Sequence, residues 1–166
     1  MRYHNITMND MNNGDGLRVV LWVSGCNHHC KNCQNPVTWN ANDGLIFDDN
    51  TKQELFQKLQ QDHISGITLS GGDPLYPNNR EDILELVKEI RNSFPNKTIW
   101  IYTGYIYNEV LQDELMRSII SNIDVLVDGE FQEELKDVNY HWAGSTNQQV
   151  IDVKESLKKG SVIRYE

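Results

Sequence analysis

The chain lacks a long apolar segment and any cluster of basic residues. Its longest apolar runs, such as residues 17–23, which include Arg18, are far too short to cross a bilayer. Its first ten residues contain no apolar segment of the signal-peptide type. Lysine and arginine total 15 against 24 aspartate and glutamate residues, which gives a formal net charge of -9. Nucleic acid and membrane are therefore disfavoured as partners, and we expect a soluble cytoplasmic protein.

Cysteine is scarce and unevenly placed. The sequence has only three cysteines, Cys26, Cys30 and Cys33, and no fourth anywhere. An odd number confined to one short segment disfavours a disulfide framework. The cluster favours a metal site in a reducing compartment.

Length and patterning predict one α/β domain over residues 1–166. Four apolar segments predict buried strands, and segments with helical apolar spacing lie between or after them. The first predicted helix begins with a capping box formed by Asn50 and Gln53. The predicted strands are 17–23, 66–70, 98–103 and 123–128, with a last strand at 161–166; the predicted helices are 50–61, 80–92, 108–120 and a short one within 150–160.

This alternation predicts mostly parallel strands joined by right-handed crossovers. An open or partial β/α barrel is the preferred architecture, and a flat doubly wound sheet is the alternative. Glycines follow three of the strands, at Gly71-Gly72, Gly104 and Gly129. Because ligands bind at the carboxyl ends of parallel strands, we expect the double glycine before Asp73 to serve binding, and Gly104 and Gly129 to serve turns.

The cysteine spacing, Cys-x-x-x-Cys-x-x-Cys, suits either an iron–sulfur cluster or zinc. A four-iron cluster normally takes four cysteines, so three would leave one iron open to an external ligand. The alternative is a zinc site of three cysteines and one histidine, for which His28, His29 and His63 are available. Spacing alone leaves both chemistries open.

The segment from Cys26 to Cys33 resembles the cluster motif of the radical S-adenosylmethionine superfamily. Within it, the chain is similar to the activating proteins of anaerobic ribonucleoside-triphosphate reductases along nearly its whole length. The residues that carry the resemblance are Asn13-Gly14, Gly16 and Arg18; Val23-Ser24-Gly25-Cys26; Thr38-Trp39; Leu69-Ser70-Gly71-Gly72-Asp73-Pro74-Leu75; Trp100 and Thr103-Gly104-Tyr105; Val125-Leu126-Val127-Asp128-Gly129; and Gly144-Ser145 with Asn147-Gln148.

The resemblance implies a partial barrel of the radical S-adenosylmethionine type and a set of site residues. Cys26, Cys30 and Cys33 would ligate three irons of a [4Fe–4S] cluster, and S-adenosylmethionine would chelate the fourth. Asn32, Cys33 and Gln34 would lie beside the adenine, and Gly72 would present backbone groups to the methionine ammonium. We expect Asp73 to shape the turn that follows.

The resemblance also implies an activity and partners. The enzyme would cleave S-adenosylmethionine reductively to a 5′-deoxyadenosyl radical and generate a glycyl radical on the large subunit of anaerobic ribonucleoside-triphosphate reductase. Reduced flavodoxin or ferredoxin would supply the electron. The alternatives are an activase of another glycyl radical enzyme, of the pyruvate formate-lyase type, and a non-catalytic zinc-binding interaction module.

The sequence gives weaker support for a functional role of several other polar and aromatic residues. His28 and His29 are expected to be solvated loop residues, and Trp39, Trp100 and Trp142 to be core or interface anchors. Asp128 could bind ribose hydroxyls or stabilise a turn.

Overall fold

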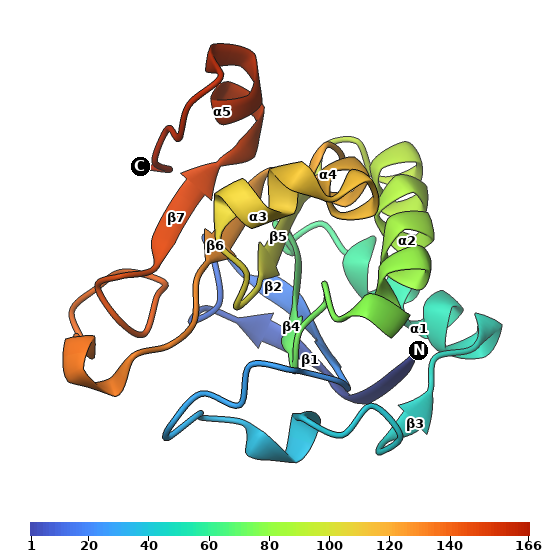
Figure 1. Cartoon of the computed structure of the whole chain (residues 1–166). Coiled ribbons are helices and arrows are strands. Elements are labelled where there is room, and N and C mark those ends of the chain that lie inside the picture. The colour runs from blue at the N-terminus through green and yellow to red at the C-terminus, as the bar shows by residue number, and fades with distance from the viewer.

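Seven strands form one open, mixed sheet in the computed structural model, which describes residues 1–166 (Figure 1). The strands are β1 (Arg2–Asp10), β2 (Arg18–Val23), β3 (Leu45–Ile46), β4 (Gly66–Gly71), β5 (Thr98–Tyr102), β6 (Val125–Asp128) and β7 (Gln149–Asp152), in the order β3-β1-β2-β4-β5-β6-β7. Neighbours among β2, β4, β5 and β6 are parallel, and β1, β3 and β7 are antiparallel to their neighbours. The predicted α/β class is confirmed; the parallel strands occupy the centre of the sheet, antiparallel strands lie toward both edges, and the sheet does not close.

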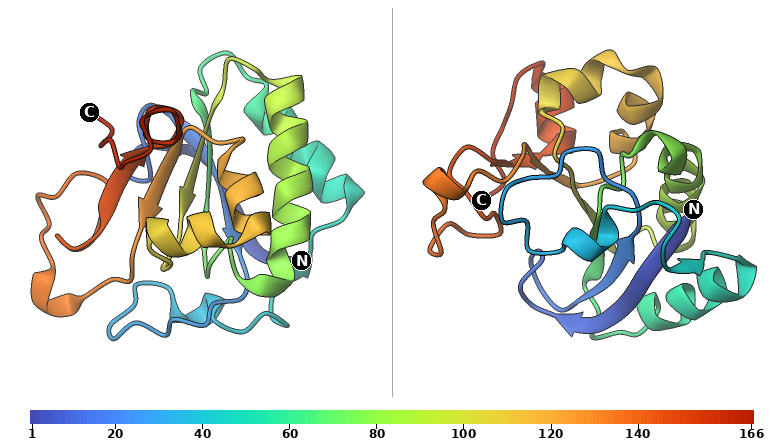
Figure 2. Two further views of the ribbon diagram at one scale, coloured as in Figure 1. Left: turned by 45° about the horizontal axis from the view of Figure 1, so that its top comes forward. Right: turned by 60° about the horizontal axis from the view of Figure 1, so that its bottom comes forward.

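Five helices connect or follow these strands. They are α1 (Asp49–Leu59), α2 (Arg80–Ser93), α3 (Tyr107–Gln112), α4 (Glu114–Ile120) and α5 (Val153–Lys159). The parallel strands follow one another across the sheet without reversing direction. Right-handed crossovers therefore place the connecting helices on a single face, and Figure 2 shows α2, α3 and α4 grouped on one side of the sheet. A doubly wound sheet reverses its order and carries helices on both faces, so that alternative is wrong.

Side chains alternate between the two faces of the parallel strands, as strand geometry requires. Toward the helices, residues such as Leu21, Leu69 and Ile101 join the main hydrophobic core with the apolar faces of α1, α2 and α4. Toward the other face, Trp100, Val125, Val127 and Val150 form a smaller cluster that contains no helical residue. One face of the sheet is thus free of helices and available to loops and ligands.

Four local predictions are wrong. The segment 150–160, predicted to form a short helix, begins as strand β7, and α5 starts only at Val153. The first helix is capped by Asp48, whose side chain accepts a hydrogen bond from the Thr51 N–H, so the Asn50 capping box is not formed. The helix predicted over 108–120 is broken at Asp113, which caps α4 instead. The last strand predicted over 161–166 is reduced to a single bridge between Arg164 and Ile151 of β7.

Arg18 closes the end of the sheet opposite the carboxyl ends of the parallel strands. It is fully buried, and its guanidinium donates to Thr68 Oγ1, Thr98 Oγ1 and the carbonyl oxygens of Ile67 and Thr98. The guanidinium carbon lies 5.4 Å from the ring centroid of Trp100. Burial lowers the pKa of Arg18 to about 10. The side chain therefore ties β2, β4 and β5 together beneath the helix-free face.

None of the five helices combines the length and apolar character needed to cross a membrane.

Candidate functional site

A cavity of about 720 Å³ opens at the carboxyl ends of the parallel strands and continues along the helix-free face of the sheet. Its floor includes Trp22, Ser70 and Tyr102, which point away from the helices. Its walls come from the loop of residues 24–44, which we call the cysteine loop, and from residues 129–144. Figure 1 shows the cysteine loop passing beneath the strand ends, next to the segment that follows β6. The volume lies in the range of small-molecule sites.

The charge of the cavity restricts what it can bind. Asp73 and Glu130 are its only carboxylates, and no lysine or arginine lines it. A polyphosphate would therefore find no lysine or arginine partner there, and the ring nitrogens of His28 already contact the two carboxylates. The lining instead suits a ligand that carries positive charge.

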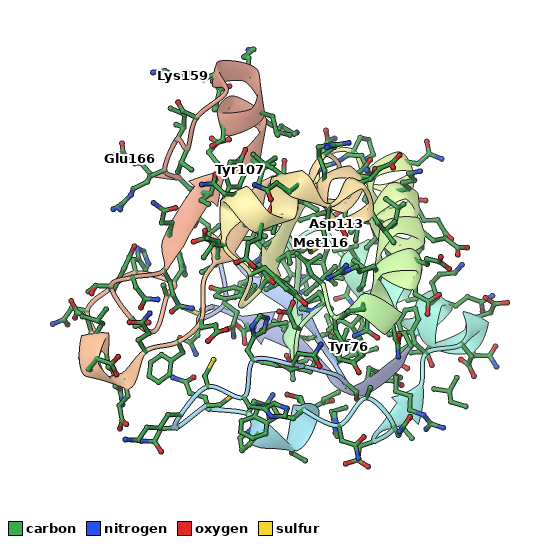
Figure 3. The ribbon with its side chains drawn as sticks, viewed as in Figure 1. Tyr76, Tyr107, Asp113, Met116, Lys159 and Glu166 are labelled. Carbon is green, nitrogen blue, oxygen red and sulfur yellow. The ribbon has the colours of Figure 1, made fainter.

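All three cysteines line this cavity as free, half-buried thiols. The base of their loop is held to the end of the short 3-10 helix Pro36–Thr38 by two backbone hydrogen bonds, from Gly25 N to Thr38 O at 2.7 Å and from Cys26 N to Trp39 O at 3.1 Å. Tyr76, labelled in Figure 3, packs against Gly25, where a side chain would not fit. The loop thus has a fixed base below a turn that carries the thiols.

The turn itself contains two non-glycine residues in the left-handed region. His29 has φ 49° and Asn32 has φ 57°. Such conformations are uncommon outside glycine and concentrate at functional sites. They curl the chain so that Cys26, Cys30 and Cys33 all reach the same cavity.

Burial favours the protonated thiol at two of the three cysteines in the metal-free chain. Burial raises the pKa of Cys26 to about 11, and burial also raises the pKa of Cys30. A metal or cluster binds thiolates, so its binding would release these protons.

The donor set fits a cluster better than a single ion. No three side chains among His, Cys, Asp and Glu gather closely enough to hold one metal ion. Tetrahedral zinc needs every sulfur about 2.3 Å from one point, whereas a four-iron cluster holds each cysteine on a different iron. Three thiols that line one cavity without converging on one point are compatible with the second arrangement.

Asp73 is buried at 1% exposure and joins three loops at the carboxyl edge. Its Oδ1 accepts from the Leu75 N–H at 2.8 Å, which confirms the predicted turn role. Its Oδ2 accepts from Thr103 Oγ1 at 2.9 Å and from the Gly104 N–H at 3.0 Å, both in the loop after β5. The same oxygen lies 2.9 Å from Nε2 of His28.

His28 corrects a sequence-based prediction. Its side chain is only 10% exposed, so it is not a solvated loop residue. The ring lies between two carboxylates, with Nε2 on Asp73 and Nδ1 3.0 Å from Glu130 Oε1, and it contacts Tyr105 edge to face. Burial lowers the pKa of His28, but the hydrogen bonds to Asp73 and Glu130 raise it by a larger amount, so the net shift is upward.

His29 behaves differently from its neighbour. Its ring stacks on Trp39 within the same loop, with centroids 4.4 Å apart. Trp100 is buried in the core, as predicted, and both Trp142 and Tyr165 pack against it.

Close packing explains two of the glycines that follow strands. A Cβ on Gly72 would lie 2.5 Å from the Gly25 carbonyl oxygen and 2.7 Å from that of Thr38. A Cβ on Gly104 would overlap the ring of His28, so Gly104 is more than a turn residue. Gly129 has φ 89° and open surroundings, which agrees with its predicted turn role.

The structure brings most of the predicted site residues together. Cys26, Cys30, Cys33, Gln34 and Gly72 all line the cavity. Asn32 does not line it and serves the turn of the loop.

Asp128 is a turn residue that lies outside the cavity. Its buried carboxylate accepts from the Tyr107 and Gln149 N–H groups at 2.9 Å each. Burial raises its pKa.

Gln148 organises the wall formed by residues 129–144. Its Oε1 accepts from the N–H groups of Gly144 and Ser145, and its Nε2 donates to the Gly129 carbonyl oxygen. These bonds close the segment on itself, so that Phe131 and Trp142 are presented to the cavity. The Gly-Ser-x-Asn-Gln pattern pointed to this segment, whereas no local signal pointed to Glu130 or Phe131.

Comparison with known proteins places the chain among cluster-binding proteins. The family described as "4Fe-4S single cluster domain" matches residues 12–151. An anaerobic ribonucleoside-triphosphate reductase-activating protein of Enterobacteria phage T4 is 44% identical over 150 residues, covering 90% of this chain and 93% of the relative. Proteins of the same name from Escherichia coli strain K12 and Pasteurella multocida are 43% and 41% identical, over 90% and 89% of this chain and 97% and 95% of those relatives.

Proposed function

The chain belongs to the family of anaerobic ribonucleoside-triphosphate reductase-activating proteins, and we propose that it is a radical S-adenosylmethionine enzyme that generates a glycyl radical on that reductase. One observation carries the proposal. The chain has three thiols and no fourth. All three line the same cavity as the glycine turn after β4, at the carboxyl ends of the parallel strands. That arrangement offers a cluster with one free iron and a pocket beside it.

The cofactors would supply the chemistry. With both bound, one electron from the reduced [4Fe–4S] cluster would break a carbon–sulfur bond of S-adenosylmethionine, giving methionine and a 5′-deoxyadenosyl radical that takes a hydrogen atom from a glycine of the reductase. The protein's contribution is to bind, to orient and to exclude water.

We assign the protein's side of this chemistry to residues on the cavity wall. Cys26, Cys30 and Cys33 would ligate three irons. Gly72 and Gln34 would bind S-adenosylmethionine, with the backbone of Cys33 beside the adenine and Asn32 shaping the turn that holds Cys33. The absence of lysine and arginine from the lining supports this assignment, because the sulfonium and ammonium groups of S-adenosylmethionine are cationic.

The same charge argument bears on the reductase's nucleotide. A triphosphate would meet two carboxylates and no lysine or arginine in this cavity. The partner recognised here would be the reductase polypeptide, with reduced flavodoxin or ferredoxin as electron donor. We also propose that the singly wound sheet is a partial barrel of the radical S-adenosylmethionine type, with its interior on the helix-free face.

The proposal is tested with anaerobically purified protein. We expect a brown protein with iron and sulfide in near-equal amounts, which forms 5′-deoxyadenosine when reduced with S-adenosylmethionine. Mixing with the reductase should give a glycyl radical signal in electron paramagnetic resonance, and a reductase labelled with deuterium at glycine should transfer the label to 5′-deoxyadenosine. A colourless protein with stoichiometric zinc would overturn the proposal.

Matched variants separate cluster loss from misfolding. Cys33→Ala should remain folded but lose colour and 5′-deoxyadenosine formation, whereas a structural zinc module would unfold. His63 is exposed and its side chain hydrogen-bonds to Asn9, away from the cavity. His63→Ala should keep both properties.

A further inference from the structure

The contacts of His28 link the cysteine loop to three strand ends at once. Its ring nitrogens lie 2.9 Å from Asp73 Oδ2 in the loop after β4 and 3.0 Å from Glu130 Oε1 in the loop after β6. Its ring edge fills the space over Gly104, in the loop after β5, where a Cβ would overlap it. No other side chain between Cys26 and Cys30 bonds to the sheet side of the cavity, because His29 stacks within the loop on Trp39.

Asp73 is itself held in place from several directions. Thr103 Oγ1, the Gly104 N–H and the Leu75 N–H all donate to its carboxylate, and it is almost completely buried. The position of its Oδ2 is therefore set by the strand ends. Because His28 is hydrogen-bonded to that oxygen, the segment between Cys26 and Cys30 is held in a fixed position relative to the strand ends.

We propose that His28 is a positioning residue that clamps the Cys26–Cys30 segment to Asp73 and Glu130 and so fixes the cluster relative to the S-adenosylmethionine pocket. The inference deepens the proposed function and rests on it for the part that concerns the cluster. The contact with the loop itself needs no cofactor. Positioning on this scale matters because a small misplacement of reacting groups lowers the rate strongly.

Amide hydrogen exchange of the metal-free, full-length chain tests the clamp directly. The Cys26 N–H bonds to Trp39 O and the Cys33 N–H bonds to Cys30 O, so both report opening of the loop. In His28→Phe we expect their exchange to rise about tenfold or more, the scale for losing one charge-assisted hydrogen bond. Exchange in β4 and β5 should not change, and unchanged exchange at Cys26 and Cys33 would overturn the proposal.

Glu130 offers a second test that keeps the histidine. Its side chain is 52% exposed, so substitutions there should not prevent folding. Glu130→Ala removes the acceptor for Nδ1, whereas Glu130→Gln keeps an amide oxygen for it. We expect faster exchange in the first variant and rescue toward the wild-type rate in the second; equal rates in the two variants would count against the clamp.

The electron paramagnetic resonance signal of the reconstituted enzyme tests the positioning role itself, because a residue that only stabilises the fold would not change how the cluster responds to S-adenosylmethionine. In the wild type, S-adenosylmethionine should change the electron paramagnetic resonance signal of the reduced cluster. In His28→Phe we expect iron and sulfide contents like those of the wild type but a weakened change on adding S-adenosylmethionine. His63→Ala is the matched histidine control. A full change in His28→Phe would overturn the positioning role, whereas a wild type without iron would overturn the proposed function and, with it, the cluster part of this inference.

Discussion

The Cα atom of Gly104 lies so close to the ring of His28 that no methyl group fits between them. The backbone of Gly104 is not in the left-handed region, so the position needs glycine for space and not for conformation. The loop after β5 and the cysteine loop are therefore packed as two complementary surfaces.

Gly104→Ala should lower the free energy of unfolding by about 1–3 kcal/mol, the usual cost of overpacking. The same substitution in a His28→Ala background should cost close to nothing, because the ring that it would meet is gone. Denaturant unfolding of the two single variants and the double variant measures this coupling. Additive costs would show that the strain lies elsewhere than at His28.

Arg18 is the second close-packed position, and its substitution should be costly. Arg18→Met would leave the Ile67 and Thr98 carbonyl oxygens and Thr68 Oγ1 without their buried donor. Unsatisfied buried groups cost about 1–3 kcal/mol each, so we expect a loss of about 3 kcal/mol or more in the free energy of unfolding.

Arg164→Met is the control for that measurement. Arg164 is exposed, and its side chain makes no hydrogen bond in the structure. Its substitution should stay within about 0.5 kcal/mol of the wild type in the same denaturant titration. Similar losses in the two variants would contradict a special role for Arg18.

The sequence predicted the parallel strands because each is a short apolar run that ends near glycine. Most residues of β2 and β4 are buried, and the exceptions, Trp22, Ser70 and Gly71, line the cavity. The antiparallel strand β1 was missed because Arg2–Asp10 is polar and mostly half-buried, without a clear alternation. Its pairing with β2 is a tertiary effect that local pattern does not encode.

The sequence predicted the part of the site whose residues lie close together in the chain. The three cysteines lie within one loop, and their spacing alone indicated a metal. The role of His28 could not be predicted, because its partners Asp73 and Glu130 are 45 and 102 residues away. Only the meeting of β4 and β6 with the cysteine loop creates that contact.

Asp113 explains why one predicted helix is two, and the break can be tested. Its carboxylate accepts from the Met116 N–H at 2.8 Å and lies 3.3 Å from Arg80 Nη1; Asp113 and Met116 are labelled in Figure 3. Asp113→Ala should lower the free energy of unfolding by about 1 kcal/mol through loss of this cap. Asp113→Asn keeps a cap acceptor and should cost less. Equal losses in thermal unfolding would point to the Arg80 contact instead.

Asp124 should make stability depend on pH at the acid end. Burial raises the pKa of this carboxyl, but hydrogen bonds from Arg91, the Ile99 N–H and Lys154 lower it by a larger amount. The net shift is therefore downward. A carboxyl whose folded pKa lies below its unfolded value of about 3.9 stabilises the protein above that pH. The stabilisation is lost as pH falls through the lower, folded pKa.

Asp124→Asn should therefore be less stable than the wild type by about 2 kcal/mol at neutral pH, the scale for charge-assisted hydrogen bonds at a partly buried site. The gap should stay constant down to about pH 5 and narrow below it. Urea unfolding at intervals between pH 3 and 7 measures both curves, with Asp49→Asn as the exposed control. A gap that widens toward acid would mean that the Asp124 carboxylate is destabilised in the folded protein, because then protonation would favour folding.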